Sequence, residues 1–202
     1  MTMLKKIKDV LIEPKKFFQR IQKEKGYKKA FVYFAILSFF STVIGFLFSI
    51  AMIPLYRHIL ESFALTIPTL QNYGWLAINQ VIGYLIGLLG SFVVAGLLYA
   101  WILIFGGKAG YEKTYQLFVY SRTPQFLFGW IPAIGLVASI YGLVILIIGT
   151  MQLHKINKTK AILMYVIPIT IFGLILILFW GLIIFAIAKN PEILQQILLQ
   201  YK

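Results

Sequence analysis

Long, nearly uncharged blocks alternate along this chain with short segments that carry its basic residues, glycines and prolines. A block of about 20 apolar residues is long enough for a helix to cross the hydrocarbon core of a bilayer. The blocks are continuously apolar and lack the period-two alternation of a barrel strand, so their backbone groups must be satisfied within helices. The pattern therefore predicts an all-α polytopic membrane bundle of five transmembrane helices. The predicted spans are residues 30–53, 75–105, 114–131, 133–153 and 161–188.

Composition supports the same class. Apolar residues make up 60% of the 202 residues and charged residues only 12%, whereas a soluble domain averages about 25% charged residues. The mean hydropathy is +0.87. The chain has no cysteine, which excludes disulfides and thiol nucleophiles, and its two histidines, His58 and His154, are too far apart in sequence to form a metal site alone. We therefore expect neither a metal nor a cofactor.

Residues 1–29 precede the first span and have two faces. Leu4, Ile7 and Leu11 form one apolar group, and Phe17, Phe18 and Ile21 form a second. Apolar faces edged with lysine are typical of helices that lie in the headgroup layer, although a solvated basic tail would share this charge. The residues expected to contact anionic lipid are Lys5, Lys6, Lys8, Lys15, Lys16, Arg20 and Lys23.

The net charge of +13 indicates a membrane surface rather than nucleic acid. Ten of the nineteen Lys and Arg residues lie before residue 30, where they can attract anionic headgroups. At the other end of the chain, residues 189–202 are predicted to form a short amphipathic tail. Other membrane proteins or further copies of this chain are the remaining candidate partners.

Small residues recur at four-residue or similar spacing within three of the spans. Such stripes let a neighbouring helix approach closely, and packing is a more common role for them than lining a pore. The predicted helix-packing residues are Ser41, Gly45, Ser49, Gly83, Gly87, Ser91, Gly135, Ser139 and Gly142.

The number of crossings depends on residues 114–131, which follow a turn containing Gly106, Gly107 and Gly110. If they cross, fifteen Lys and Arg residues lie in inside segments and three in outside segments, with Arg122 uncounted. If they lie on the surface, the basic loop at residues 154–160 is forced outside, and the positive-inside rule is satisfied less well. We therefore expect five crossings of the cell membrane, a cytoplasmic N-terminus and an extracytoplasmic C-terminus.

Arg122 is then a charge within the third span. A central arginine costs at least about 2.5 kcal/mol on insertion scales, and none of the six acidic residues lies within an apolar span. Pro124 cannot donate to the carbonyl of Tyr120, so that oxygen is free for another donor. We expect Tyr120, Arg122 and Pro124 to form one structural or partner-binding unit. Arg122 either reaches the headgroups or structural acceptors, or contacts a ligand.

Several of these segments together resemble the Yip family of membrane proteins, which are related to Ypt/Rab-interacting proteins. They are EPKKFF, GGKAGYEKT, VYSRTP and GTMQLHKINKTKA, and the resemblance covers roughly residues 10–188. It implies five helical spans and a cytoplasmic N-terminus. In eukaryotes such proteins are implicated in vesicle traffic and Rab GTPase binding. This chain lacks their long acidic N-terminal region, which argues against GTPase binding.

Two functions remain as hypotheses. The first is a non-enzymatic integral membrane protein that organises membrane, serves trafficking or scaffolds partners, since no HExxH, GxSxG or Walker motif is present. The second is a small-molecule or ion transporter or channel, for which Arg122 and the glycine-rich spans are the support. Against the second, proton and cation relays commonly use buried carboxylates, and no two-fold repeat is evident.

Overall fold

The computed structural model describes residues 2–62 and 73–190. Within them the chain forms eight helices and no strand. The helices are α1 (Met3–Ile12), α2 (Pro14–Ile21), α3 (Lys28–Ser62), α4 (Tyr73–Ile104), α5 (Tyr111–Ser121), α6 (Thr123–Phe128), α7 (Pro132–His154) and α8 (Lys158–Lys189). The predicted amphipathic tail lies outside the described residues from residue 191 onward.

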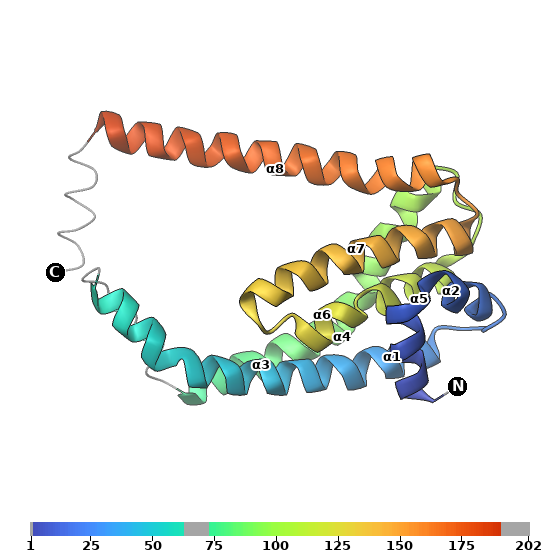
Figure 1. Ribbon diagram of the computed structural model, residues 1–202, viewed down its shortest axis with the longest axis horizontal. Helices are drawn as coiled ribbons and strands as arrows, with labels where there is room; N and C mark the ends of the chain where they lie inside the picture. The colour runs from blue at the N-terminus through green and yellow to red at the C-terminus, as the bar shows by residue number, and fades with distance from the viewer. Residues whose placement is uncertain (1, 63–72, 191–202) are drawn as a thin grey trace.

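Four of these helices are long and apolar enough to cross a membrane: Lys28–Leu60, Tyr73–Ile104, Pro132–His154 and Lys158–Lys189. They contain four of the five predicted spans. The first helix is longer than predicted, because α3 continues through Pro54. A proline within a helix removes one backbone hydrogen bond and favours a bend, and α3 bends in its C-terminal part, where Pro54 lies (Figure 1).

The segment predicted as the third span forms two short helices, α5 and α6, with Arg122 between them. Together, the 18 residues from Tyr111 to Phe128 would extend about 27 Å as a helix at 1.5 Å per residue. Eight consecutive residues, 114–121, are buried, as in a helix surrounded by protein on all sides. The chain reverses direction at each connection from α3 through α4, α5–α6 and α7 to α8 (Figure 1).

The N-terminal helices pack against the bundle. α2 lies along α7, and α1 contacts α6 as well as α2. Phe17, Phe18 and Ile21, the apolar group predicted to face the headgroup layer, are buried in the protein core. The reason is a close approach: a Cβ atom added at Gly149 of α7 would lie 2.7 Å from the Phe18 ring, so the missing side chain makes room for the phenylalanine.

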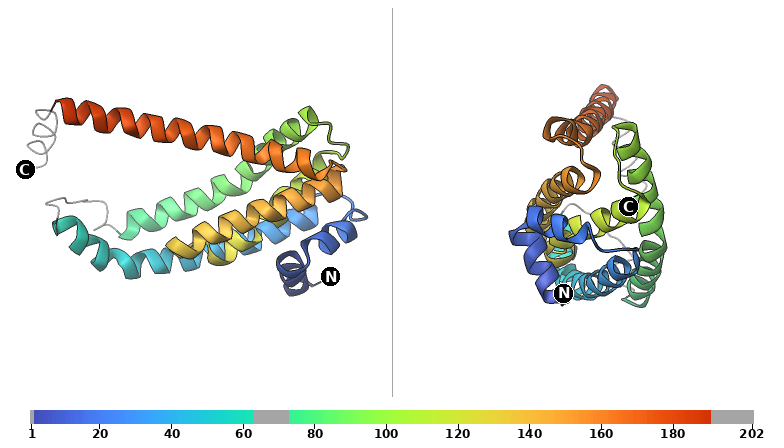
Figure 2. Two further views of the ribbon diagram at one scale, coloured as in Figure 1. Left: turned by 45° about the horizontal axis from the view of Figure 1, so that its top comes forward. Right: turned by 90° about the vertical axis from the view of Figure 1, so that its right-hand side faces the viewer.

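α8 diverges from the rest of the molecule. Its buried residues, Ala161, Met164 and Tyr165, all lie near its N-terminal end. Beyond them, α8 extends away from α4 and α7 (Figures 1 and 2). The Trp101 indole of α4 donates a 3.0 Å hydrogen bond to the Met164 carbonyl and so fixes this end of α8. A wedge between α4 and α8 results.

Candidate functional site

The break between α5 and α6 positions the residues of greatest interest. Pro124 lies in the first turn of α6 and supplies no backbone N–H, and Arg122 adopts φ −83° and ψ 0° between the helices. The Thr123 hydroxyl donates to the Tyr120 carbonyl at 2.7 Å. The carbonyl freed by the proline therefore has a side-chain donor from Thr123, and Arg122 does not fill that role.

Tyr120 and Arg122 face different parts of the molecule. The buried Tyr120 ring makes edge contacts with Phe17 and Tyr33, at centroid distances of 4.9 and 5.0 Å. The Arg122 side chain instead lines a cavity bounded by α4, α7 and α8. Two residues correspond to about 200° around a helix, which explains the opposite placement. The structure thus does not bring Tyr120, Arg122 and Pro124 together as a single side-chain cluster.

Lys6 differs from its predicted role as a lipid contact. Only 7% of the residue is exposed, and its ammonium donates a 2.8 Å hydrogen bond to the Tyr120 hydroxyl. It also forms an ion pair with Glu24 at 3.5 Å. A buried charge needs such partners to offset the loss of hydration. Lys6 therefore joins α1 to α5 inside the protein, while the other six predicted lipid-contacting residues are exposed.

A polar clasp on α5 holds the linker between α2 and α3, and we define it as Glu112, Lys113 and Gln116. The Lys113 ammonium donates to the carbonyls of Ile21, at 2.8 Å, and Glu24. These are backbone acceptors just at and beyond the end of α2, where helices leave carbonyls unpaired. Gly26 is bound through both its backbone groups: the Glu112 carboxylate accepts from its N–H at 2.9 Å, and the Gln116 amide donates to its carbonyl at 2.7 Å. The same amide also donates to the Glu24 carbonyl at 3.2 Å.

Burial lowers the pKa of Lys113, while the charges of Glu24 and Glu112 oppose that effect. The clasp was not predicted from the amino-acid sequence. The signal for it in the sequence is the spacing, since Glu112 and Gln116 are four residues apart and lie on one helical face, across the predicted boundary between the loop and the third span.

The predicted glycine turn connects α4 to α5 and lies beside the end of α7. Gly106 has φ +85°, a conformation that glycine adopts at little cost. A Cβ at Gly107 would lie 3.0 Å from the His154 Nδ1 atom, and Gly110 is the N-cap of α5. On the other ring edge, His154 Nε2 and the Thr114 hydroxyl share a 3.1 Å hydrogen bond. The buried His154 therefore connects the glycine turn to α5.

The stripe of small residues on α7 faces α5 and α6. A Cβ at Gly142 would lie 3.0 Å from the Ser121 carbonyl, and one at Gly135 would lie 2.8 Å from the Gly129 carbonyl. Between these glycines, the Ser139 hydroxyl accepts a 3.0 Å hydrogen bond from Gln125. The absence of side chains at these glycines is what allows the broken helix to lie so close to α7.

The stripes of small residues on α3 and α4 differ in how closely their members pack against other helices. On α3, a Cβ at Gly45 would lie 3.4 Å from that of Trp130; Ser41 and Ser49 are half-buried. On α4, the Ser91 hydroxyl shares a 3.0 Å hydrogen bond with that of Tyr115. Gly83 and Gly87 are exposed, and no atom of the described chain lies within 4 Å of an added Cβ at either.

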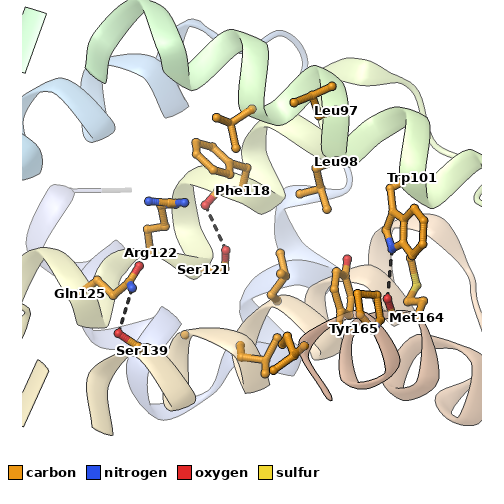
Figure 3. A pocket seen from close by; sticks show the side chains of 16 residues that line it. Leu97, Leu98, Trp101, Phe118, Ser121, Arg122, Gln125, Ser139, Met164 and Tyr165 are labelled. Atoms are coloured by element: carbon orange, nitrogen blue, oxygen red, sulfur yellow. Dashed lines mark hydrogen bonds between the residues drawn. The ribbon is translucent and has the colours of Figure 1, made fainter. Parts of the chain in front are cut away.

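The cavity that Arg122 lines has a volume of about 520 Å³, within the range of small-molecule sites. One end carries Arg122, Gln125 and Ser139, and the opposite end carries Trp101, Met164 and Tyr165 (Figure 3). The guanidinium carbon lies 4.5 Å from the centre of the Phe118 ring. The cavity therefore combines one cation with apolar walls.

No group of three or more metal-ligating side chains occurs in the described part of the chain. The carboxylates with defined contacts, those of Asp9, Glu13, Glu24 and Glu112, all serve the N-terminal helices or the clasp.

A model of the Yip1 domain family matches residues 8–185. Neither a comparison with curated proteins nor one with solved structures found a significant match. The matched range includes α2 to α7, the clasp, the helix break and most of α8.

Proposed function

Because the chain belongs to the Yip family of multi-pass membrane proteins, we propose that it is a non-enzymatic membrane-organising scaffold. In this proposal the chain crosses the cell membrane five times, with the N-terminus in the cytoplasm and the C-terminus outside. One end of the bundle is a fixed basic surface that gathers anionic lipid headgroups and partner proteins. The family is not known for enzymatic activity, and its members interact with other membrane and trafficking proteins.

The observation that carries the proposal is the position of the basic residues. Fifteen of the nineteen Lys and Arg residues lie in residues 1–29, 106–113 and 154–160. These segments meet at one end of the bundle, where α1, α2, the start of α5, the end of α7 and the start of α8 lie together (Figure 1). The positive-inside rule favours a cytoplasmic location for that end. The reversals of chain direction through α5–α6 support a fifth crossing there.

The N-terminal helices are held in one orientation. Besides the buried phenylalanines, Gln22 donates a 2.7 Å hydrogen bond to the Gln152 carbonyl, and Tyr141 donates to the Leu11 carbonyl. With the apolar face of α2 fixed on the protein, its lysines and arginine point outward. On α1, by contrast, Leu4 is 79% exposed. This geometry favours a fixed basic surface, which we call the platform and define as the basic residues of residues 1–29, 106–113 and 154–160. It does not favour a tail that binds the membrane through its own apolar face.

Of the seven residues predicted to contact anionic lipid, four are exposed and form no ion pair within the described chain. Arg20 pairs with Asp9 and Lys16 with Glu13. Lys5, Lys8, Lys15 and Lys23 are exposed and form no ion pair within the described chain. Each lysine near an anionic surface contributes about 1 kcal/mol, so the four together would enrich anionic lipid around this end.

The test measures the lipid that accompanies the protein. The full chain is extracted from membranes in polymer-bounded discs, and the anionic fraction of the disc lipid is compared with that of the whole membrane. We expect enrichment for the natural chain and loss of that enrichment when Lys5, Lys8, Lys15 and Lys23 are changed to glutamine. The matched control, Arg57→Gln with Lys189→Gln, lies outside the basic end and should retain enrichment. Equal anionic fractions in all three would overturn the platform.

A further inference from the structure

We infer that the cavity beside Arg122 is a lateral binding site for one anionic lipid, whose phosphate contacts the Arg122 guanidinium and whose acyl chain lies between α4 and α8. This site opens on the side of the bundle, where Arg122 is exposed, and is separate from the basic end. The inference does not depend on the proposed function.

The first step is the charge. Arg122 has no hydrogen bond from its side chain and no ion pair within the described chain, and its one recorded contact is with the Phe118 ring. Neighbouring polar groups have internal partners: Ser121 donates to the Phe118 carbonyl at 3.0 Å, and Gln125 donates to Ser139. A guanidinium facing an apolar cavity without a carboxylate is complementary to an anion.

The second step is the shape of the walls. Arg122, Gln125 and Ser139 occupy one end, and the lining from α4 and α8 is apolar apart from the edge groups of Trp101 and Tyr165 (Figure 3). A volume of about 520 Å³ exceeds what a small inorganic anion needs. The cavity therefore fits a ligand with one charged end and a long apolar part.

The third step is the route of entry. A second cavity of about 390 Å³ lies between α4 and α8 and shares Trp101 and Pro168 with the first. Its other lining residues are all apolar: Phe105, Leu163, Ile167, Ile171, Phe172 and Ile175. The two cavities adjoin at these shared residues, beside the wedge where α8 diverges from α4. The divergence of the two helices is visible in Figure 2. A hydrated ion gains no favourable free energy from contact with such apolar walls, whereas an acyl chain does, because its apolar surface is removed from water.

The fourth step explains why the charge is in this place. The break at Arg122 turns the side chain away from the Tyr120 side and towards α4 and α8. The neighbouring α7 stripe brings Ser139 to the same end of the cavity. The wedge results from the divergence of α8, and the position of the Arg122 cation results from the α5–α6 break. These two independent features place the cation beside the wedge.

Trp101 provides a direct probe, because it lines both cavities. In a variant with Trp75, Trp130 and Trp180 changed to phenylalanine, only Trp101 fluoresces. The protein is placed in bilayer discs with brominated phosphatidylglycerol or brominated phosphatidylcholine at matched mole fractions. Bromine atoms quench tryptophan on contact, so the ratio of the two quenching constants reports preference for the anionic lipid.

We expect Arg122 to give about a tenfold preference for phosphatidylglycerol, which corresponds to about 1.4 kcal/mol. Arg122→Gln should reduce the ratio to about one, and Arg122→Lys should restore part of it, since lysine keeps the charge but not the two-pronged geometry. A second single-tryptophan variant that retains only Trp180, which is exposed on α8, should show no preference. The basic-end quadruple variant should leave the Trp101 ratio unchanged.

Should Arg122→Gln prevent folding, Val94→Phe tests the same site with the charge in place. Val94 lies on α4 and lines the cavity, so a larger side chain should exclude the lipid and lower the Trp101 ratio. Equal quenching by both lipids in the natural Arg122 background would overturn the inference. Relief of the preference by millimolar inorganic phosphate would assign the site to a free anion and would also overturn it.

Discussion

At the scale of single residues, the hydrogen bond between Lys6 and Tyr120 connects the first helix to the centre of the bundle. The lysine is 114 positions before the tyrosine, and the contact is buried. Removing one partner of a buried bond leaves the other without its hydration or its partner, which costs more than the bond itself contributes. The pair therefore has a greater effect on stability than its exposed neighbours.

Tyr120→Phe should lower the free energy of unfolding by about 1–3 kcal/mol, since the Lys6 ammonium would lose its hydrogen bond and retain only the longer contacts with Glu24 and the aromatic ring. Reversible unfolding by titration with a denaturing detergent gives this quantity. A double-mutant cycle with Lys6→Met should show a coupling energy of at least about 0.5 kcal/mol. Tyr99→Phe is the matched control, because the Tyr99 hydroxyl forms no hydrogen bond within residues 2–62 and 73–190. A cost no greater than that of the control would contradict this role.

Gly149 of α7 lies where side chains of α2 and α5 pack against that helix. A Cβ there would lie 2.3 Å from a Leu117 methyl and 2.7 Å from the Phe18 ring. Gly149→Ala should therefore destabilise the protein by about 1–3 kcal/mol, as overpacked cores do. Gly87→Ala, at an open position on α4, should be neutral or slightly stabilising. Measured unfolding free energies that are the same for the two variants would show that α2 moves away without cost.

At the scale of elements, the clasp on α5 determines where the N-terminal helices are held. The Lys113 ammonium contacts two backbone carbonyls of residues 21–24, and Gln116 and Glu112 contact Gly26. The exposed Lys23 and Lys25 lie in the same linker. Local opening of this linker would make both residues substrates for trypsin.

Lys113→Met should raise the rate of tryptic cleavage after Lys23 and Lys25 by about tenfold, since each hydrogen bond from a charged donor contributes about 1.5–3 kcal/mol. The cleavage rate is measured by mass spectrometry on the protein in detergent. Lys108→Met removes an exposed lysine from the neighbouring turn, and cleavage in the linker should be unchanged. A rate for Lys113→Met that equals the control rate would show that the phenylalanine contacts alone hold α2.

Much of the fold was predictable from sequence because long apolar blocks report membrane helices directly. The family resemblance and the helical membrane class are confirmed by the Yip1 match and by the four long apolar helices. The placement of α2 was not predictable, because Phe17 and Phe18 look the same whether they face lipid or Gly149. Likewise, only the three-dimensional structure shows that Lys6 points inward while Lys5 and Lys8 point outward.

The site was predictable in part for the same reason. Arg122 could be singled out from the sequence because it is a charged residue in an apolar block. In the structure its side chain lines the cavity. Its separation from Tyr120 could be expected from the angle between two residues on a helix. The wedge between α4 and α8 could not be expected, since it depends on where α8 stops packing.

At the scale of the whole molecule, the proposed five crossings place the two ends of α8 on opposite sides of the membrane. Because the chain lacks cysteine, a single introduced cysteine gives an unambiguous signal. On intact cells, Asn190→Cys should react with an impermeant maleimide, and Lys158→Cys should react only after permeabilisation. If α5–α6 does not cross, α7 and α8 run the other way and this labelling pattern is reversed.

The seating of Phe18 against Gly149 also has a consequence for synthesis. Phe18 leaves the ribosome about 130 residues before its pocket exists, and at 5–20 residues per second the wait is roughly 7–26 s. During this interval α2 must keep three large apolar side chains out of water beside a newly inserting span. Its lysines favour the nearest anionic bilayer as a temporary shelter. We therefore expect the amphipathic pattern of α2 to matter during synthesis as well as in the folded bundle.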